Sequence, residues 1–189
     1  MAQNIDPHKL VRDCLREKIL AQRQLYDLFA PPMLGVCYRY TKSIADAEDV
    51  LQEGFIKVFR CLQQYKGEGE LGAWIRRIMV TTAINYLKKN ARYQSELVFT
   101  DEPLHAVSGA DPELKLEAKE LAALIRQLPP GYQTIFNLHA VEGYTHVQIG
   151  AMLGIQEGTS RSQYARARAL LVSWLQTRDT IKNTVYAGK

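Results

Sequence analysis

The chain has 189 residues, 47% of them hydrophobic and 23% charged, and its formal net charge is +4 at pH 7. This length suits one ordinary domain or two small ones, and the hydrophobic content excludes disorder throughout. The net charge is too small to establish nucleic-acid binding by itself, so the positions of the charges carry the information.

The amino-terminal residues predict neither export nor membrane insertion. Residues 1–9 are polar and lack the apolar core of a signal peptide, and nowhere do about 18 apolar residues run together. Cys14, Cys37 and Cys61 form no C-x-x-C pair and have no histidine at ligand spacing. We therefore expect a cytoplasmic protein with reduced thiols, no disulfide and no metal site.

A first helical block is expected over residues 5–92. It is punctuated by Pro31 and Pro32, by the polar step at residues 41–43, and by the glycine-rich residues 66–70, which should form a loop between helices. Alternating polar and apolar runs bounded by turn residues, which are typical of strands, are missing from the sequence. The pattern predicts an all-α fold.

The helix expected after residues 41–43 has an acidic side and an apolar side. On a helical turn of about 3.6 residues, Asp46, Asp49 and Glu53 gather roughly opposite the apolar residues. An acidic helix face of this kind indicates a docking surface for another protein. The apolar residues are Leu51, Phe55, Val58, Phe59 and Leu62.

The following helix, expected from Gly72 onward, has a basic stripe, since five cations and no carboxylate lie in residues 71–95. Cations bind phosphates, aromatic rings stack on unpaired bases and amides read base edges, so the stripe suits single-stranded DNA. Tyr65 and Lys66 in the preceding loop can enclose a base pulled out of the stack. Trp74 has apolar neighbours, and packing in the core is the commoner role of such an indole. The stripe consists of Trp74, Arg77, Thr81, Asn85, Lys88 and Arg92.

Residues 94–112 lose the apolar periodicity and contain prolines, glycine and acidic residues, as a linker does. Periodicity resumes over residues 114–128 and stops at Pro129, and a further helix is expected over residues 133–141. We therefore expect two small helical domains joined by a flexible linker.

Residues 145–171 have the pattern of a helix-turn-helix. Thr145 can cap the first helix, Gly154 supplies the turn, and residues 157–159 open the second helix. A unit of this kind places its second helix in the major groove of duplex DNA.

This second helix should present a polar face to DNA. Tyr164, Ala167 and Leu171 are expected to face inward, and the opposite side should display small, hydroxyl and guanidinium groups, which suit base edges and phosphates. An ordinary helical hairpin with a solvated arginine face is the alternative. The displayed residues would be Arg161, Ser162, Ala165 and Arg166, with Thr159 at the flank.

In this combination and order, the motifs resemble those of the bacterial extracytoplasmic-function (ECF) sigma factors, the smallest members of the sigma-70 family. The likeness covers roughly residues 24–92 and 113–176. Residues 46–59 are similar to the region 2.2 docking helix, 65–74 to the region 2.3 melting loop, 75–92 to the region 2.4 helix and 124–171 to the region 4 helix-turn-helix.

The resemblance implies a sigma factor, a subunit without catalysis or cofactor that directs core RNA polymerase to promoters and helps open the DNA. In this family, region 2 binds the clamp coiled coil of polymerase and captures the unpaired minus-10 strand. Region 4 rides on the flap and reads the minus-35 duplex, and anti-sigma proteins commonly hold both regions. The implied segments are a region 2-like domain (1–94), a linker (95–112), a region 4-like domain (113–178) and a tail (179–189).

Carried onto this chain residue by residue, the resemblance implies three binding sets. The polymerase-binding set is Asp46, Glu48, Asp49, Gln52 and Glu53. The minus-10 set is Tyr65, Lys66, Trp74, Arg77, Thr81, Asn85, Lys88 and Arg92. The minus-35 set is Thr159, Arg161, Ser162, Gln163 and Arg166.

The sequence departs from the family's usual pattern at several positions. Gly150 stands where Ala is usual, which weakens that helix by up to about 1 kcal/mol. Ser160 replaces a buried Val and is expected to bond back to a carbonyl one turn earlier. Gln163 replaces an Arg and Thr81 stands where Asn is frequent, so the preferred promoter sequence does not follow from that of relatives.

Two other functions are weaker interpretations. A stand-alone helix-turn-helix regulator would bind duplex DNA without polymerase, and it would need neither the acidic face nor a stripe suited to single strands. An enzyme would need a nucleophile, a metal site or a phosphate loop, and the four histidines have no partner at such spacing. His139 and His146 are expected to have packing or capping roles.

Overall fold

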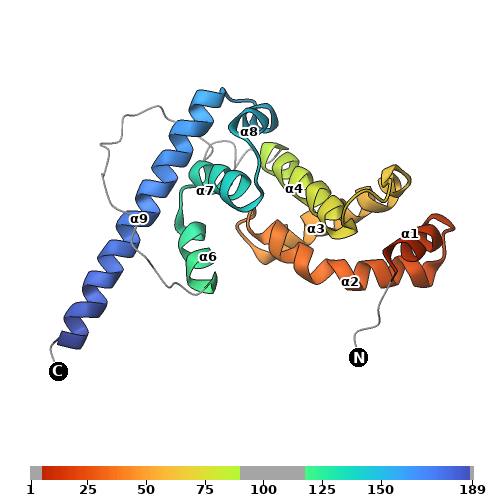
Figure 1. Cartoon of the computed structure of the whole chain (residues 1–189), viewed down its shortest axis with the longest axis horizontal. Coiled ribbons are helices and arrows are strands. Elements are labelled where there is room, and N and C mark those ends of the chain that lie inside the picture. Colours follow the sequence, from red (N-terminus) through yellow and green to blue (C-terminus); the bar gives the residue numbers. More distant parts are fainter. Residues whose placement is uncertain (1–5, 90–117, 188–189) are drawn as a thin grey trace. The chain divides into compact units, whose positions relative to one another are not determined.

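The structure, a computed structural model, describes residues 6–89 and 118–187 and, in the second range, the side chains of residues 120–177. All regular secondary structure in these ranges is helical (Figure 1), which confirms the predicted all-α class. The chain divides into two compact units, Met1–Asn90 and Ala91–Lys189. The expected linker, residues 95–112, lies outside the described residues, as does Arg92. Among the helices of the described ranges, none has the length and apolar character needed to cross a bilayer.

The first unit is a helical bundle around an apolar core. It contains α1 (Pro7–Leu15), α2 (Ile19–Tyr38), α3 (Ile44–Cys61) and α4 (Leu71–Lys89), with a 3-10 turn, η1 (Leu62–Gln64), directly after α3. Helices α2, α3 and α4 pack against one another, and α1 packs on α2. The buried side chains at the centre include Leu25, Val50, Val58, Ile75, Met79 and Ile84.

The structure corrects one expectation about this unit, because α2 runs through Pro31 and Pro32. Proline lacks the N–H that bonds the carbonyl four residues earlier, so the carbonyls of Asp27 and Leu28 lose their helical donors. Both of these residues are exposed, and water can therefore bond their carbonyls. The prolines therefore weaken α2 on its solvent-exposed side, but they do not end the helix.

The polar step at residues 41–43 separates α2 from α3, as predicted. Ser43 has an extended backbone, and its side-chain oxygen accepts a hydrogen bond of 3.0 Å from the backbone N–H of Asp46. This N-cap satisfies a donor that the first turn of α3 would otherwise leave unpaired.

Helices α3 and α4 approach closely at Gly54. A Cβ atom at this position would lie 2.2 Å from Sδ of Met79 on α4. The absence of a side chain at Gly54 therefore allows α3 and α4 to pack closely. This close packing sets the rotation of α3 about its axis and thus which residues of α3 face solvent.

The cysteines are free thiols in the first unit, as predicted. Cys14 and Cys37 are buried, and Cys61 is half-buried. Burial raises the pKa of Cys37 to about 12, so this thiol stays protonated at neutral pH.

The second unit contains α6 (Ala118–Gln127), α7 (Pro130–Phe136), η2 (Asn137–Val141), α8 (His146–Leu153) and α9 (Glu157–Ala187). The helix expected over residues 133–141 begins earlier, because a proline in the first turn needs no N–H, and it ends in the π-helical turn η2. Helix α9 continues into the segment expected as a tail. The apolar core joins α6 to α9 through Leu124, Ile125, Leu128, Ala167 and Leu171.

Helices α8 and α9 form the expected helix-turn-helix. Thr145 caps α8, since its hydroxyl accepts from the N–H of Gln148 at 3.3 Å and the Gln148 side chain accepts from the Thr145 N–H at 2.9 Å. Gly154 ends α8 with a φ of 73°, in the left-handed region that favours glycine. A Cβ at Gly150 would lie 2.8 Å from the carbonyl oxygen of Ile155. Gly150 weakens the helix but makes room for this tight turn.

Candidate functional site

The acidic face of α3 is open to solvent at its centre. Glu48, Asp49 and Gln52 are exposed, and they make no hydrogen bond or ion pair within the described part of the chain. They lie on the side of α3 away from buried residues such as Val50. A partner can reach these three side chains without breaking a bond of the protein itself.

The two carboxylates at the edges of this face have internal partners. The Tyr86 hydroxyl donates to Oδ1 of Asp46 at 2.7 Å, and Nζ of Lys57 donates to Oε1 of Glu53 at 2.6 Å. The hydrogen bond from Lys57 lowers the pKa of the Glu53 carboxyl. Of these two members of the predicted polymerase-binding set, Asp46 is therefore held by a neutral hydroxyl, and Glu53 is partly neutralised by Lys57.

A hollow of about 390 Å³ lies beside the acidic face, between α2 and α3. Tyr26 and Leu34 of α2 and Leu51 of α3 supply apolar lining, while Glu48 and Gln52 line it as well. We call this hollow the α2–α3 groove. The contribution of α2 was not predicted, because the groove requires side chains from two helices.

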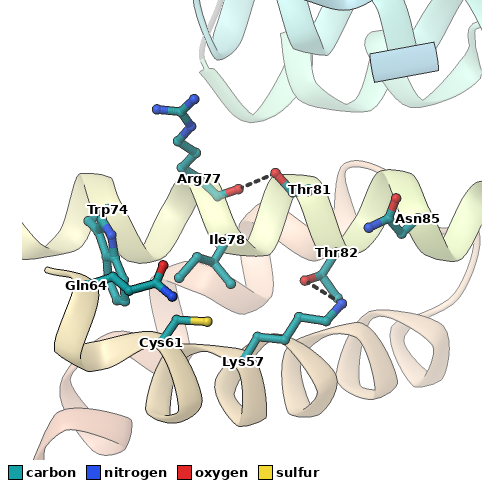
Figure 2. A pocket seen from close by; sticks show the side chains of 9 residues that line it. All are labelled: Lys57, Cys61, Gln64, Trp74, Arg77, Ile78, Thr81, Thr82 and Asn85. Atoms are coloured by element: carbon teal, nitrogen blue, oxygen red, sulfur yellow. Dashed lines mark hydrogen bonds between the residues drawn. The ribbon is translucent and has the colours of Figure 1, made fainter. Parts of the chain in front are cut away.

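A second hollow, of about 420 Å³, lies between α3 and α4 (Figure 2). Trp74, Arg77, Thr81 and Asn85 line it from α4, at the steps of three and four that place residues on one side of a helix. We call it the α3–α4 groove. It brings four members of the predicted minus-10 set to one surface.

The α3–α4 groove also contains residues that were not predicted. Lys57 and Cys61 line it from α3, and Thr82 lines it from α4. Besides its bond to Glu53, Nζ of Lys57 donates to Oγ1 of Thr82 at 3.3 Å (Figure 2). The available signal was spacing, because Lys57 follows Glu53 by about one helical turn.

Trp74 is half-buried and lines the groove, so it does not belong wholly to the core. Its ring centroid lies 5.7 Å from that of Tyr65. The Tyr65 hydroxyl donates to the carbonyl of Gly69 at 2.8 Å, and Gly67 and Gly69 have φ values of 79° and 82°. Two left-handed glycines thus fold the loop of residues 65–70 back towards Tyr65.

Two further members of the minus-10 set, Lys66 and Lys88, fall within the described residues. Lys66 in the loop and Lys88 on α4 are exposed. The Thr81 hydroxyl donates to the carbonyl of Arg77 at 2.9 Å, so only its lone pairs are left for an incoming donor.

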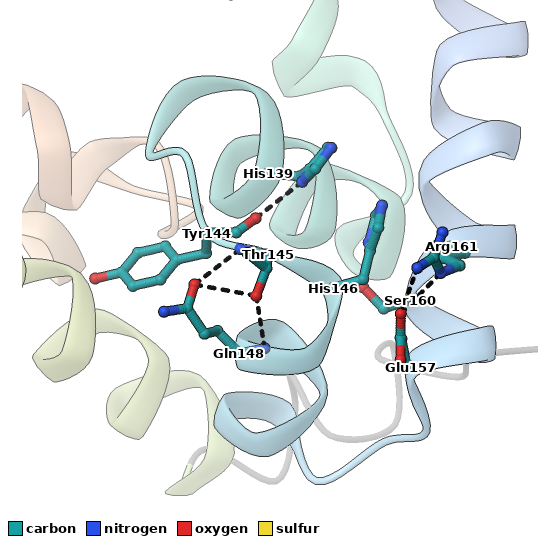
Figure 3. Close-up of polar contacts among 8 residues, drawn as sticks. All are labelled: His139, Tyr144, Thr145, His146, Gln148, Glu157, Ser160 and Arg161. Atoms are coloured by element: carbon teal, nitrogen blue, oxygen red, sulfur yellow. Dashed lines mark hydrogen bonds and ion pairs between the residues drawn. The ribbon is translucent and has the colours of Figure 1, made fainter.

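The start of α9 presents Arg161 to solvent, with Thr159 and Ser162 half-exposed beside it. Nε of Arg161 donates to Oε1 of Glu157 on the same helix at 2.9 Å (Figure 3). This ion pair is exposed and weak, so DNA can compete with Glu157 for the guanidinium group.

The structure corrects the expected display of Arg166, and it buries Gln163 as well. Gln163 is 0% exposed and Arg166 is 9% exposed. Gln163 follows Ser160 by three residues and precedes Ala167 by four, so all three lie on the inward side of α9. Arg166 precedes Ala167 directly, and its long aliphatic stem can pack against the unit. Neither side chain is presented to a duplex in this structure.

Ser160 bonds a histidine and not a backbone carbonyl, which corrects a second expectation. Nδ1 of His146 lies 2.9 Å from Oγ of Ser160 (Figure 3), and the rings of His146 and His139 stack at 4.2 Å. Tyr164 meets the His139 ring edge-on at 4.6 Å. Burial lowers the pKa of His146, and the charges of His139 and Arg161 lower it further. Both histidines pack, as predicted.

Comparison with known proteins gives two family matches, Sigma-70 region 2 over residues 25–93 and Sigma-70, region 4 over residues 118–171. The RNA polymerase sigma-H factor of Pseudomonas aeruginosa is 30% identical over 155 residues, which cover 76% of this chain and 80% of that protein. The chain belongs to the sigma-70 family.

Other similar proteins are ECF sigma factors. The ECF RNA polymerase sigma-E factor of Escherichia coli is 32% identical over 149 residues, which cover 73% of this chain and 78% of that protein. The sigma-E factor of Haemophilus influenzae is 28% identical over 93% of this chain and 98% of that protein. A solved complex of the sigma factor RpoE with the anti-sigma factor NepR from Bartonella quintana has 22% identity, covers 82% of this chain and 96% of that chain, and has a TM-score of 0.49.

This sigma factor is therefore a transcription initiation factor and not an enzyme, and its partners are RNA polymerase and promoter DNA. The region 2 match contains the acidic face and the α3–α4 groove, and the region 4 match contains the helix-turn-helix up to Leu171. A stand-alone regulator would not need the first of these matches.

Proposed function

We propose that this sigma factor binds the clamp coiled coil of RNA polymerase through the acidic face of α3 and the α2–α3 groove. The observation that carries this proposal is an unpaired polar rim, the carboxylates of Glu48 and Asp49 with the amide of Gln52, beside apolar side chains of Tyr26 and Leu34. A helix with basic and apolar side chains would complement both parts. Opposite charges would speed the encounter and set the register, while apolar burial would supply affinity.

The α3–α4 groove and the loop of residues 65–70 would then take the unpaired minus-10 strand. Arg77 is suited to phosphates, Asn85 to base edges, and Trp74 with Tyr65 to stacking. The exposed side chains of this set, Lys66, Thr81 and Lys88, would add flanking contacts, and the proposal extends to Arg92 on family likeness alone.

Region 4 would bind the polymerase flap and contact the minus-35 duplex through Arg161, Ser162 and Thr159. These side chains are accessible at the start of α9, where a recognition helix meets base edges. Gln163 and Arg166 would support this helix from within the unit.

On the same family likeness we place the protein in the cytoplasm, together with polymerase. An anti-sigma protein that held both units would cover the acidic face and the recognition helix at once. Polymerase and such an inhibitor would therefore compete for this sigma factor.

The polymerase contact is tested by charge reversal at Asp49. Asp49→Lys should weaken association with core polymerase by about tenfold or more, because a lysine there would repel the basic partner. Association is measured by pull-down with purified core enzyme, and helix content by circular dichroism. Run-off transcription should fall in parallel.

Asp27→Lys is the matched control, since Asp27 is an exposed carboxylate of α2 that pairs with Arg23 at 3.7 Å and does not line the α2–α3 groove. It should bind polymerase like the unaltered chain. Normal polymerase binding by Asp49→Lys would refute the proposed docking face.

A further inference from the structure

Two cations line the α3–α4 groove, Arg77 and Lys57. Arg77 is exposed, but the ammonium group of Lys57 is held between Glu53 at 2.6 Å and Thr82 at 3.3 Å. Figure 2 shows the Lys57 side chain reaching from α3 to Thr82 on α4. The groove thus contains a positive charge that the protein itself neutralises.

Glu53 connects the groove to the acidic face. It follows Asp49 by four residues and precedes Lys57 by four, so the three side chains lie along one side of α3. The hydrogen bond from Lys57 lowers the pKa of Glu53, which keeps the pair ionised at neutral pH. One carboxylate is therefore shared between a protein-docking surface and a nucleic-acid groove.

The pair is accessible and can be broken by competition. The Lys57 and Glu53 side chains are 36% and 42% exposed. A lysine ammonium group is a compact charge on a flexible stem, so it can turn to a phosphate when its carboxylate partner is occupied. A basic group of a docked protein is a suitable competitor for that carboxylate.

We propose that Lys57 is a phosphate contact for the unpaired strand and that Glu53 masks it until polymerase engages Glu53. This inference rests on the proposed function, because it needs polymerase at the acidic face and a strand in the α3–α4 groove. Polymerase docking then strengthens strand binding, and strand binding strengthens docking by the same factor. For a partly exposed ion pair the factor is about two- to fivefold.

Oligonucleotide binding by the free full-length chain, without polymerase, tests whether Glu53 masks Lys57. Glu53→Gln should raise its affinity for a fluorescently labelled, single-stranded oligodeoxythymidine about two- to fivefold at low salt, as measured by anisotropy. Lys57→Gln should lower that affinity and reduce the slope of log affinity against log salt by about 0.7, the value for one single-strand phosphate contact. In the double variant, Glu53→Gln should have no further effect.

Asp27→Asn is the matched control, because it also removes a carboxylate from an i,i+4 ion pair but lies on α2. It should leave oligonucleotide affinity unchanged. The mask is overturned if Glu53→Gln has no effect, if Asp27→Asn raises the affinity equally, or if the gain persists in the double variant. Thermal unfolding of each variant reports whether the fold is kept.

Oligonucleotide binding by the Arg77→Ala variant distinguishes a failure of the mask from a failure of the proposed strand site. If Arg77→Ala weakens oligonucleotide binding while Glu53→Gln does not strengthen it, the groove binds the strand and the mask alone is wrong. If Arg77→Ala and Lys57→Gln both leave binding unchanged, the groove is not a strand site, and both proposals fail.

Discussion

His146 joins the two helices of the helix-turn-helix through its bond to Ser160 at 2.9 Å. The bond connects the first turn of α8 to the first turn of α9, the part of the unit that would face DNA. The stacked His139 ring at 4.2 Å occupies the adjoining space. A proton on His146 would place a charge in this partly buried stack, and burial accordingly lowers the pKa of His146.

This lowered pKa predicts a loss of stability in mild acid. The unfolded chain takes up a proton near the ordinary value of 6.5, before the folded chain does, so the stabilising effect is complete above that pH and decreases below it. The melting temperature of the second unit should therefore fall as the pH drops from neutral through 6.5. His146→Gln should flatten this dependence, and an unchanged profile in the variant would exclude His146 as its source.

Arg161 is the residue of the recognition helix for which we predict the largest effect on DNA binding. Arg161→Ala should weaken minus-35 recognition by the polymerase complex by about 1–3 kcal/mol if the guanidinium group contacts a base. Gel-shift titration with core polymerase on promoter duplexes measures the change.

Gln163→Ala gives the contrasting case, because this side chain is 0% exposed. It should change the melting temperature of the second unit and leave the choice among minus-35 sequences as it was. A larger effect on sequence choice from Gln163→Ala than from Arg161→Ala would contradict the orientation of α9.

At single positions of α9 the prediction was wrong because polar side chains were expected to face outward. Tyr164, Ala167 and Leu171 were recognised as inward-facing and Ser160 was placed at a usually buried position, whereas Gln163 on the same side was expected to contact DNA and the partner of Ser160 was not foreseen. A buried polar side chain needs a partner from another element, such as His146 for Ser160, and periodicity within one helix contains no information about that partner. The same reason explains why the bond between Tyr86 and Asp46 was not predicted.

At the scale of elements, the contact between α3 and α4 depends on Gly54. Gly54→Val should lower the free energy of unfolding of the first unit by about 1–3 kcal/mol, because its methyl groups would displace Met79 from the core. Urea unfolding monitored by circular dichroism measures this loss. Polymerase association and oligonucleotide binding should weaken with it if the spacing of α3 and α4 shapes both grooves.

Gly35→Ala on α2 is the control, since a Cβ there has no neighbour within 4 Å. It should leave the stability unchanged or raise it by up to about 1 kcal/mol, as expected for Ala in place of Gly in a helix. Equal stability of the Gly54 and Gly35 variants would contradict the close packing at Met79.

The ends of several elements were predictable, because local chemistry determines them. Thr145 as a cap, Gly154 at the turn and the loop at residues 66–70 all follow from side-chain bonding or backbone freedom. The course of α2 through Pro31 and Pro32 was not predictable in this way. Whether two missing N–H groups end a helix depends on whether water can reach the freed carbonyls, which is a property of the folded unit.

At the scale of the whole molecule, the second unit has an apolar core of its own, formed by α6 and α9. Calorimetry should therefore resolve two unfolding transitions. Gly150→Ala should lower only the transition of the second unit, because its Cβ would press on the Ile155 carbonyl, although Ala is the better helix former. Gly54→Val should lower only the other transition.

A single transition shifted equally by both variants would show that the units unfold as one. A rise in stability with Gly150→Ala would show that helix propensity outweighs the crowding at Ile155. The order of the two units along the chain was predictable from the change between periodic and breaker-rich sequence. The two grooves were not, because each requires side chains from two helices.

The first half of α3 carries the acidic face, and the second half lines the α3–α4 groove. Inserting one residue between Gln52 and Lys57 would rotate every later side chain by about 100° about the helix axis. Such a change would turn Lys57 and Cys61 away from α4 while leaving Glu48 and Asp49 in place. Length variation in the descendants of this gene should therefore spare α3.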